Sequence, residues 1–208
     1  MKLFTSILPI ILLGLGLISG CSHPEKSRYQ EWADREIASG VRHDSLFLSL
    51  EIGMSRQAFI DTCWQLNRRQ LISNGPRSES VQHVLPNISP TTTINFYPDF
   101  NSDGRINQVP VLLARKVWAP WLPATSSDSL MPVVRDLFLD WYGGNDWQRF
   151  HFEGLKPMWI KIDGNRRIAL TREDEQHVKA LITDLTAIDQ EKDKLFIPPQ
   201  LPIATQTK

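Results

Sequence analysis

The sequence has few cysteines and no excess of charge of either sign. Only Cys21 and Cys63 occur among its 208 residues, and 23 Lys and Arg side chains balance 23 Asp and Glu side chains. Without a basic excess the chain lacks the electrostatic signature of nucleic-acid-binding proteins, so we expect no nucleic-acid partner. The apolar run near the N-terminus, residues 3–18, has about 16 residues and is shorter than the roughly 20 that a transmembrane helix needs.

The first 21 residues instead have the order of a secretory signal. Met1-Lys2 is a short basic start, the apolar run follows, and the small residues Ser19 and Gly20 precede Cys21. A cysteine directly after such a small pair resembles the lipobox of bacterial lipoproteins. The resemblance implies that residues 1–20 are removed as a signal peptide and that the Cys21 thiol receives a diacylglycerol. The alternative is an apolar anchor that is never cut.

A lipidated Cys21 predicts a permanent attachment to a membrane. Each buried methylene contributes roughly 0.8 kcal/mol, so two or more acyl chains hold a protein stably. Ser22 follows the cysteine, and in bacterial lipoproteins a serine at that position goes with sorting to the outer membrane. We therefore expect an outer-membrane protein of the bacterial cell envelope. Its expected partners are the membrane, through the lipid, and another envelope protein, and no cofactor is expected.

Lipidation of Cys21 would leave Cys63 without a partner for an internal disulfide. Cys63 lies in a segment with helical apolar spacing, which predicts a small, buried, hydrophobic side chain. A nucleophilic role would need a nearby base to activate the thiol, and the local sequence supplies none.

Turn signals and changes in hydrophobic periodicity divide the mature chain into four segments. Residues 21–44 form a tether with a short helix, 45–123 and 124–188 form two helix-plus-sheet units, and 189–208 form a Pro-rich tail that is loosely attached or lies along the surface. We expect an α+β fold in which the helices pack on one face of an antiparallel sheet. A tandem duplication and one continuous, unduplicated sheet would both give this pattern.

Each unit has a predicted helix and several predicted strands. Alternating apolar residues predict a strand over 46–52, and Ser55 is the expected cap of a helix that reaches about Gln70. The second helix is expected near Ser129, with Asp128 or Ser129 as its cap. The apolar stripe of the first helix comprises Phe59, Ile60, Cys63, Trp64 and Leu66. The other predicted strands cover 80–85, 92–97, 106–118, 147–152, 158–162, 167–171 and 177–185, with a helix as the alternative for the last segment.

The stretch Leu50-Glu51-Ile52-Gly53-Met54-Ser55, followed by an amphipathic helix and a meander, is similar to the small lipoproteins of the outer-membrane barrel-assembly machinery. The layout also resembles β-lactamase inhibitor proteins, which carry that helix-plus-sheet unit twice. About 30 residues carry the resemblance by motif, and the rest carry it only by the order of elements. The resemblance implies a noncatalytic scaffold that binds other proteins.

One segment has the opening of a calcium loop. Asp99, Asn101 and Asp103 place oxygen ligands at alternate positions, and Gly104 would allow the sharp bend. The twelfth position of such a loop needs a bidentate glutamate, but Pro110 stands there, so a polar hairpin turn is the alternative. None of the five histidines has the spacing of a zinc pattern: His23, His43, His83, His151 and His177.

Four tryptophans are candidate binding residues. Trp118 and Trp121 flank the rigid Pro120, and Trp141 and Trp147 flank a Gly-Gly turn. If exposed, these rings could stack on a sugar or anchor a partner chain, and if buried they would complete the core.

Arg166 and Arg167 follow the Asp163-Gly164 hairpin signal. They could hold an anionic group, or they could be ordinary solvated charges of a loop. We expect a noncatalytic module that binds a macromolecule or has a structural role. The alternatives are a glycan-binding or peptidoglycan-binding lipoprotein that uses exposed tryptophans, and an envelope hydrolase.

Overall fold

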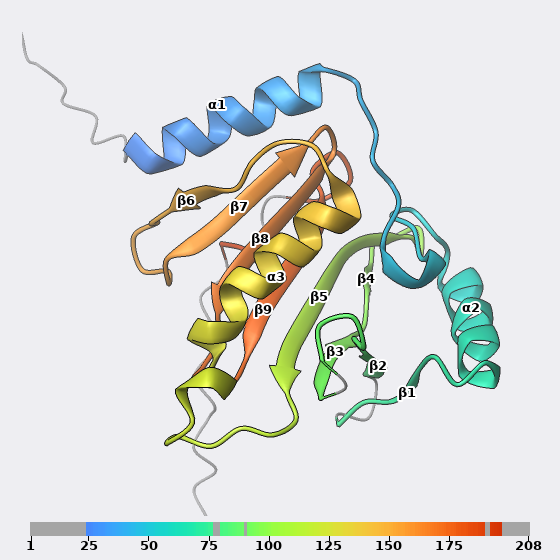
Figure 1. The fold of residues 1–208 in the computed structure, drawn as a ribbon. Helices are drawn as coiled ribbons and strands as arrows, with labels where there is room; N and C mark the ends of the chain where they lie inside the picture. Colours follow the sequence, from blue (N-terminus) through green and yellow to red (C-terminus); the bar gives the residue numbers. More distant parts are fainter. Residues whose placement is uncertain (1–23, 77–79, 90, 190–191, 197–208) are drawn as a thin grey trace, which may run out of the picture.

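The computed structural model describes residues 24–76, 80–89, 91–189 and 192–196 (Figure 1). Within these residues the fold is α+β, with three α-helices and a single antiparallel sheet, as expected. The helices are α1 (Pro24–Ala38), α2 (Arg56–Arg68) and α3 (Ser127–Tyr142), and two short 3-10 helices are η1 (Phe47–Ser49) and η2 (Pro123–Thr125). The strands are β1 (Ser73–Asn74), β2 (Val81–Val84), β3 (Thr92–Phe96), β4 (Asp99–Phe100), β5 (Ile106–Arg115), β6 (Gln148–Phe150), β7 (Met158–Asp163), β8 (Arg166–Arg172) and β9 (Val178–Asp184).

The sheet joins its two halves through their last strands. The strand order is β1-β2-β3-β5-β9-β8-β7-β6, and β4 pairs with β5 beside this path. At the centre β5 and β9 run antiparallel, from the pair Gln108 and Thr183 to the pair Leu113 and Val178. Each half therefore consists of a helix followed by antiparallel strands, and each half ends at the shared seam. This is the order that a tandem pair of units would have.

The helix α3 covers one face of the sheet and contributes to the larger core. Leu130, Val134 and Phe138 of α3 are fully buried there, and Phe59 of α2 belongs to the same cluster. The sheet contributes alternate residues of its strands, including Ile168 of β8. The predicted packing of helices on one face is thus found for α3 and for the buried side of α2, which share this core.

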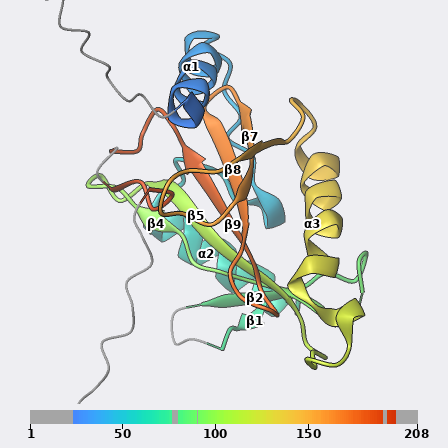
Figure 2. The same ribbon diagram turned by 90° about the vertical axis from the view of Figure 1, so that its left-hand side faces the viewer.

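The helix α1 covers the opposite face. Its residues Tyr29, Trp32 and Ala33 form a second core with Ala169 of β8. Ala169 follows Ile168 directly, and successive residues of a strand point to opposite faces of a sheet. Figure 2 shows β7, β8 and β9 between α1 and α3. The prediction that all helices pack on one face is therefore wrong for β7 to β9. These strands have apolar side chains on both faces, so a helix covers each face.

The predicted strand over 46–52 is wrong. Leu48 and Ser49 have φ angles of 55° and 60°, and the backbone turns there through η1. Ser45 then bridges to Glu51 across the turn. The prediction took the alternating leucines as the buried face of a strand. In the structure the adjacent residues Leu46 and Phe47 are both buried, which a regular strand with one buried face does not allow.

Two helix caps and part of the tail also bear on the predictions. Ser55 caps α2 as predicted, with its hydroxyl accepting a hydrogen bond from the Ala58 amide. Ser126 caps α3, so the predicted caps Asp128 and Ser129 are wrong by two or three residues. In the tail, Asp193 and Leu195 are buried, so the described residues 192–196 are not loosely attached.

Candidate functional site

The most exposed apolar side chains of α2 form a ridge along the helix. Ile60 is 38% exposed and Trp64 is 67% exposed, and exposed arginines stand one turn before and one turn after them, at Arg56 and Arg68. The four residues share one face because they are spaced four apart. We call them the α2 ridge. Since sequence reasoning placed Ile60 and Trp64 in the core stripe, it missed this surface.

The ridge stands on a firmly packed helix. Phe59 is only 2% exposed, and its ring meets Tyr97 and Phe100 with centroid distances of 5.6 and 6.0 Å. The Arg56 guanidinium lies 4.1 Å above the Phe100 ring. Because Phe59 fixes the rotation of the helix, the neighbouring Ile60 has to point outward.

Cys63 also belongs to α2 and packs against the larger core. It is half-buried, and burial raises the pKa of its thiol to about 11. The thiolate, which is the nucleophilic form, is therefore scarce at neutral pH. The prediction of a small, buried, hydrophobic side chain is thus correct in part: Cys63 lies on a helix and packs against the core, but it is only half-buried.

A second apolar surface lies in the loop between β5 and α3. Val117, Trp121 and Leu122 are 60%, 78% and 44% exposed, whereas Trp118 is half-buried. We call residues 117–122 the apolar loop. The structure thus separates the two predicted candidates: Trp121 is available to a partner, and Trp118 is only partly so.

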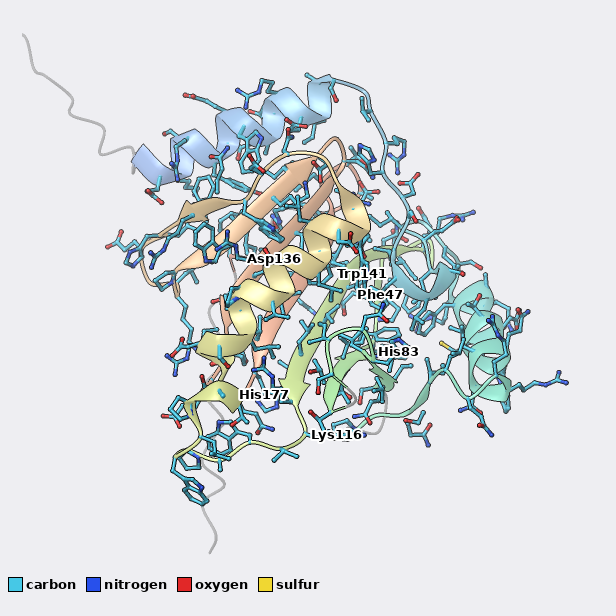
Figure 3. All side chains as sticks on the ribbon, in the orientation of Figure 1. Phe47, His83, Lys116, Asp136, Trp141 and His177 are labelled. Carbon is cyan, nitrogen blue, oxygen red and sulfur yellow. The ribbon has the colours of Figure 1, made fainter. Side chains whose placement is uncertain are left out.

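Trp141 and Trp147 are part of the core periphery and not a free binding surface. Trp141 packs on Phe47 and Phe138, with ring centroids 5.9 and 5.4 Å apart, and Figure 3 shows Trp141 beside Phe47. The Trp147 indole N–H donates to the Arg135 carbonyl at 3.1 Å. Of the two alternatives, an exposed binding residue or a part of the core, the second therefore applies to both Trp141 and Trp147.

The predicted solvated loop charge of Arg167 is wrong, because Arg167 is fully buried in β8. Its guanidinium donates to both carboxylate oxygens of Asp193, at 2.6 and 2.7 Å, and also to the Tyr29 hydroxyl and the Thr183 hydroxyl. Gln108 donates to Asp193 from β5 at 3.3 Å. Arg167 does hold an anion, but this anion is a carboxylate of its own chain.

Arg166 is also buried rather than solvated. It donates to the Ser45 carbonyl at 3.0 Å, lies 4.3 Å above the Tyr142 ring and stands 3.8 Å from Asp163. Burial lowers the pKa of Arg166. Both arginines therefore join elements that lie far apart in the sequence.

The candidate calcium segment folds as a hairpin turn. Asn101 accepts hydrogen bonds through its side chain from the amides of Asp103 and Arg105, and the carboxylate of Asp99 is paired with Lys194 at 2.7 Å. Of the two alternatives, a calcium loop or a polar hairpin turn, the structure shows the turn. Among the described residues, no group of three or more His, Cys, Asp or Glu could hold a metal ion.

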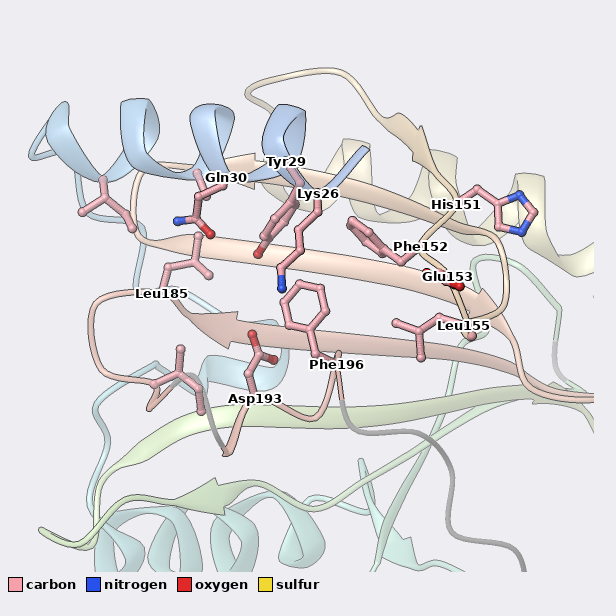
Figure 4. A pocket seen from close by; sticks show the side chains of 14 residues that line it. Lys26, Tyr29, Gln30, His151, Phe152, Glu153, Leu155, Leu185, Asp193 and Phe196 are labelled. Atoms are coloured by element: carbon pink, nitrogen blue, oxygen red, sulfur yellow. The ribbon is translucent and has the colours of Figure 1, made fainter. Parts of the chain in front are cut away.

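A cavity with a volume of about 520 Å³ lies between α1, residues 151–155 and the tail segment (Figure 4). Its polar floor includes Tyr29 and Asp193. Both are hydrogen-bonded to Arg167, and burial raises the pKa of Tyr29. These groups are committed to the buried pair and do not form an acid–base couple for catalysis.

A smaller cavity of about 270 Å³ opens beside Phe47, His83 and Trp141 on the α3 face. Figure 3 shows these side chains on the same side of the sheet. Neither Trp118 nor Trp121 lines either of the two cavities.

The predicted lipidation site, Cys21, lies outside the described residues. In the part of the chain that the structure covers, no helix has the length and apolar character needed to cross a bilayer. The chain matches no family model, no curated protein and no solved structure, so its resemblance to barrel-assembly lipoproteins stays a prediction.

Proposed function

We propose that the chain is a lipid-anchored, noncatalytic protein of the bacterial outer membrane that binds another envelope protein through the α2 ridge. The observation that carries this proposal is the exposure of Trp64, 67%, on a helix whose neighbouring Phe59 is fixed in the core. A large aromatic side chain held outward on a rigid helix loses little conformational entropy when a partner covers it.

The composition of the ridge suggests the chemistry of the partner. Tryptophan and arginine are enriched among the residues that dominate binding energy in interfaces, and the ridge offers Trp64 between Arg56 and Arg68. A fitting partner has an apolar pocket for the indole and acidic side chains around it, because complementary charge favours association and register.

The position of α2 suits a partner that approaches from the aqueous side. α2 lies at the far end of the molecule from the start of α1, where the lipid-bearing segment enters the domain (Figure 1). A membrane at the start of α1 would leave the α2 ridge uncovered.

The alternatives have less support. A glycan-binding site needs a groove beside an exposed tryptophan. Neither Trp118 nor Trp121 lines the cavities of about 520 and 270 Å³. Trp141 lines the smaller cavity, but its ring is packed against Phe47 and Phe138 and is not free to stack on a sugar. A hydrolase with a cysteine nucleophile needs a lowered thiol pKa, whereas burial raises the pKa of Cys63.

The test places a photocrosslinking amino acid at the exposed Gln57, beside the ridge, in cells that express the full chain. We expect one dominant crosslinked protein, lost in a Trp64→Ala variant and kept in the surface control Val41→Ala, which truncates an exposed apolar side chain outside the ridge. A crosslink that survives Trp64→Ala, or capture no greater than from an unrelated lipoprotein, would contradict the proposal.

The anchor is tested separately by mass spectrometry of the purified protein. We expect a mature chain that begins at Cys21 with added acyl chains. An intact leader or a free thiol at Cys21 would show that the anchoring part of the proposal is wrong.

A further inference from the structure

The start of α1 and the apolar loop lie on the same side of the molecule. In Figure 1 α1 begins at the upper left, and the chain between β5 and α3 reaches the lower left. Figure 2 views the molecule from that side, with α1 at the top and the chain that leads into α3 at the bottom. The two segments thus lie at opposite ends of one side of the molecule, the side from which a membrane could reach both.

The expected anchor leaves little distance between this side and the membrane. Three peptide steps separate Cys21 from Pro24, where α1 begins. A fully extended chain spans at most about 3.6 Å per residue, so the start of α1 can stand no more than about 11 Å from the lipidated cysteine.

The apolar loop has the composition of a membrane-interface segment. Trp121 is the most exposed of its side chains, and tryptophan is enriched where the hydrocarbon core meets the lipid headgroups. Val117 and Leu122 add apolar surface beside it, and the exposed Lys116 at the base of the loop can reach lipid phosphates.

Part of the loop backbone is hydrogen-bonded within the loop. The Leu122 amide donates to the Ala119 carbonyl at 2.9 Å, and the Thr125 amide donates to the Leu122 carbonyl at 2.9 Å. Pro120 and Pro123 carry no amide hydrogen. Because unpaired backbone groups are costly in hydrocarbon, this partial pairing fits a shallow position among the lipid headgroups, where water still reaches the remaining groups.

We infer that the apolar loop inserts into the lipid interface and, together with the lipid on Cys21, fixes the orientation of the domain on the membrane. This inference rests on the proposed anchor. The ligand is the bilayer surface itself, and the two contacts together hold the α2 ridge away from the membrane.

The experiment uses the purified full-length mature protein in vesicles of phosphatidylethanolamine and phosphatidylglycerol with brominated acyl chains, which quench nearby tryptophans. We expect the amount of tryptophan emission that the bromine atoms quench to fall in Trp121→Phe, with Trp118 accounting for any remainder. The matched control Trp64→Phe should lose only unquenched emission, because α2 is expected to face away from the bilayer.

Equal quenching in wild type and Trp121→Phe, or none in either, would overturn the inference. A crosslink from the loop to a protein, with no lipid quenching, would also overturn it and assign the loop to a protein partner. The mass of the same sample decides the anchor independently, so loss of the inference on a lipidated protein leaves the proposed function intact.

Discussion

Arg167 and Asp193 form a buried, two-pronged ion pair that ties the segment after β9 to the middle of the sheet. The two N–O distances are 2.6 and 2.7 Å, and the Arg167 side chain has no exposure to solvent. Tyr29 joins the pair from α1, so three parts of the chain meet at one guanidinium. The pair holds α1 and the tail segment against the same face of the sheet.

Replacement of one partner should destabilise the fold strongly. In Asp193→Asn the arginine stays charged and buried without its counter-charge, and we expect a loss of about 3–5 kcal/mol in the free energy of unfolding. Urea denaturation followed by circular dichroism measures it. Asp99→Asn, which breaks the partly exposed pair with Lys194, is the control and should cost less than about 1 kcal/mol. Equal losses in the two variants would contradict the role of the buried pair.

The thiol of Cys63 should react slowly in the folded protein. A pKa of about 11, compared with 9.0 for a free thiol, makes the thiolate about a hundredfold rarer at pH 8. Iodoacetamide labelling, read by mass spectrometry, should therefore be slower than in protein unfolded by guanidinium by a similar factor. The rate should rise as the pH approaches 11, and fast labelling at pH 8 would show that the helix exposes the sulfur.

Two glycines with positive φ should differ in their tolerance of alanine. Gly164 has φ +54°, and an added Cβ would lie 2.1 Å from the Val41 carbonyl oxygen, whereas Gly104 has φ +70° and no atom within 4 Å of that position. We expect Gly104→Ala to cost about 1–2 kcal/mol from backbone strain alone. Gly164→Ala should cost about 2 kcal/mol more because a backbone atom must move. Thermal unfolding of both variants measures the difference, and equal shifts would argue against close packing at the β7–β8 turn.

Truncation of a side chain should destabilise the protein on the buried side of α2 and have almost no effect on its exposed side. Phe59→Ala removes a buried ring and should cost about 3–5 kcal/mol. Trp64→Ala removes an exposed ring and should change stability by no more than about 0.5 kcal/mol. Urea denaturation compares them. A large loss in Trp64→Ala would mean that the indole packs on its own chain, and would remove the basis for assigning it to a partner.

Local patterns were enough to predict most of the regular elements. Ser55 and the apolar spacing after it located α2, and strand-forming residues located β3, β5 and β7 to β9 within a few positions. The segment around Leu48 could not be predicted, because its left-handed backbone is imposed by neighbours that bury Phe47 and Leu50 on either side.

The surroundings of charged and aromatic residues could not be predicted at all. Arg167 gains its partners from Asp193, 26 residues away, and from Tyr29, 138 residues away. No local pattern shows such a meeting. The exposure of Trp64 had a weak signal in the sequence, since the apolar stripe of α2 was too wide for one buried face and some of it had to face solvent.

The seam between β5 and β9 has a consequence for how the protein is made. Among the described residues β9 is the last strand of the sheet to be synthesised, so the edge of β5 that it covers stays open until all the other described strands have been made. Open strand edges recruit foreign strands. A product that stops shortly before Val178 would therefore be expected to aggregate or be degraded rather than persist as a stable half-molecule.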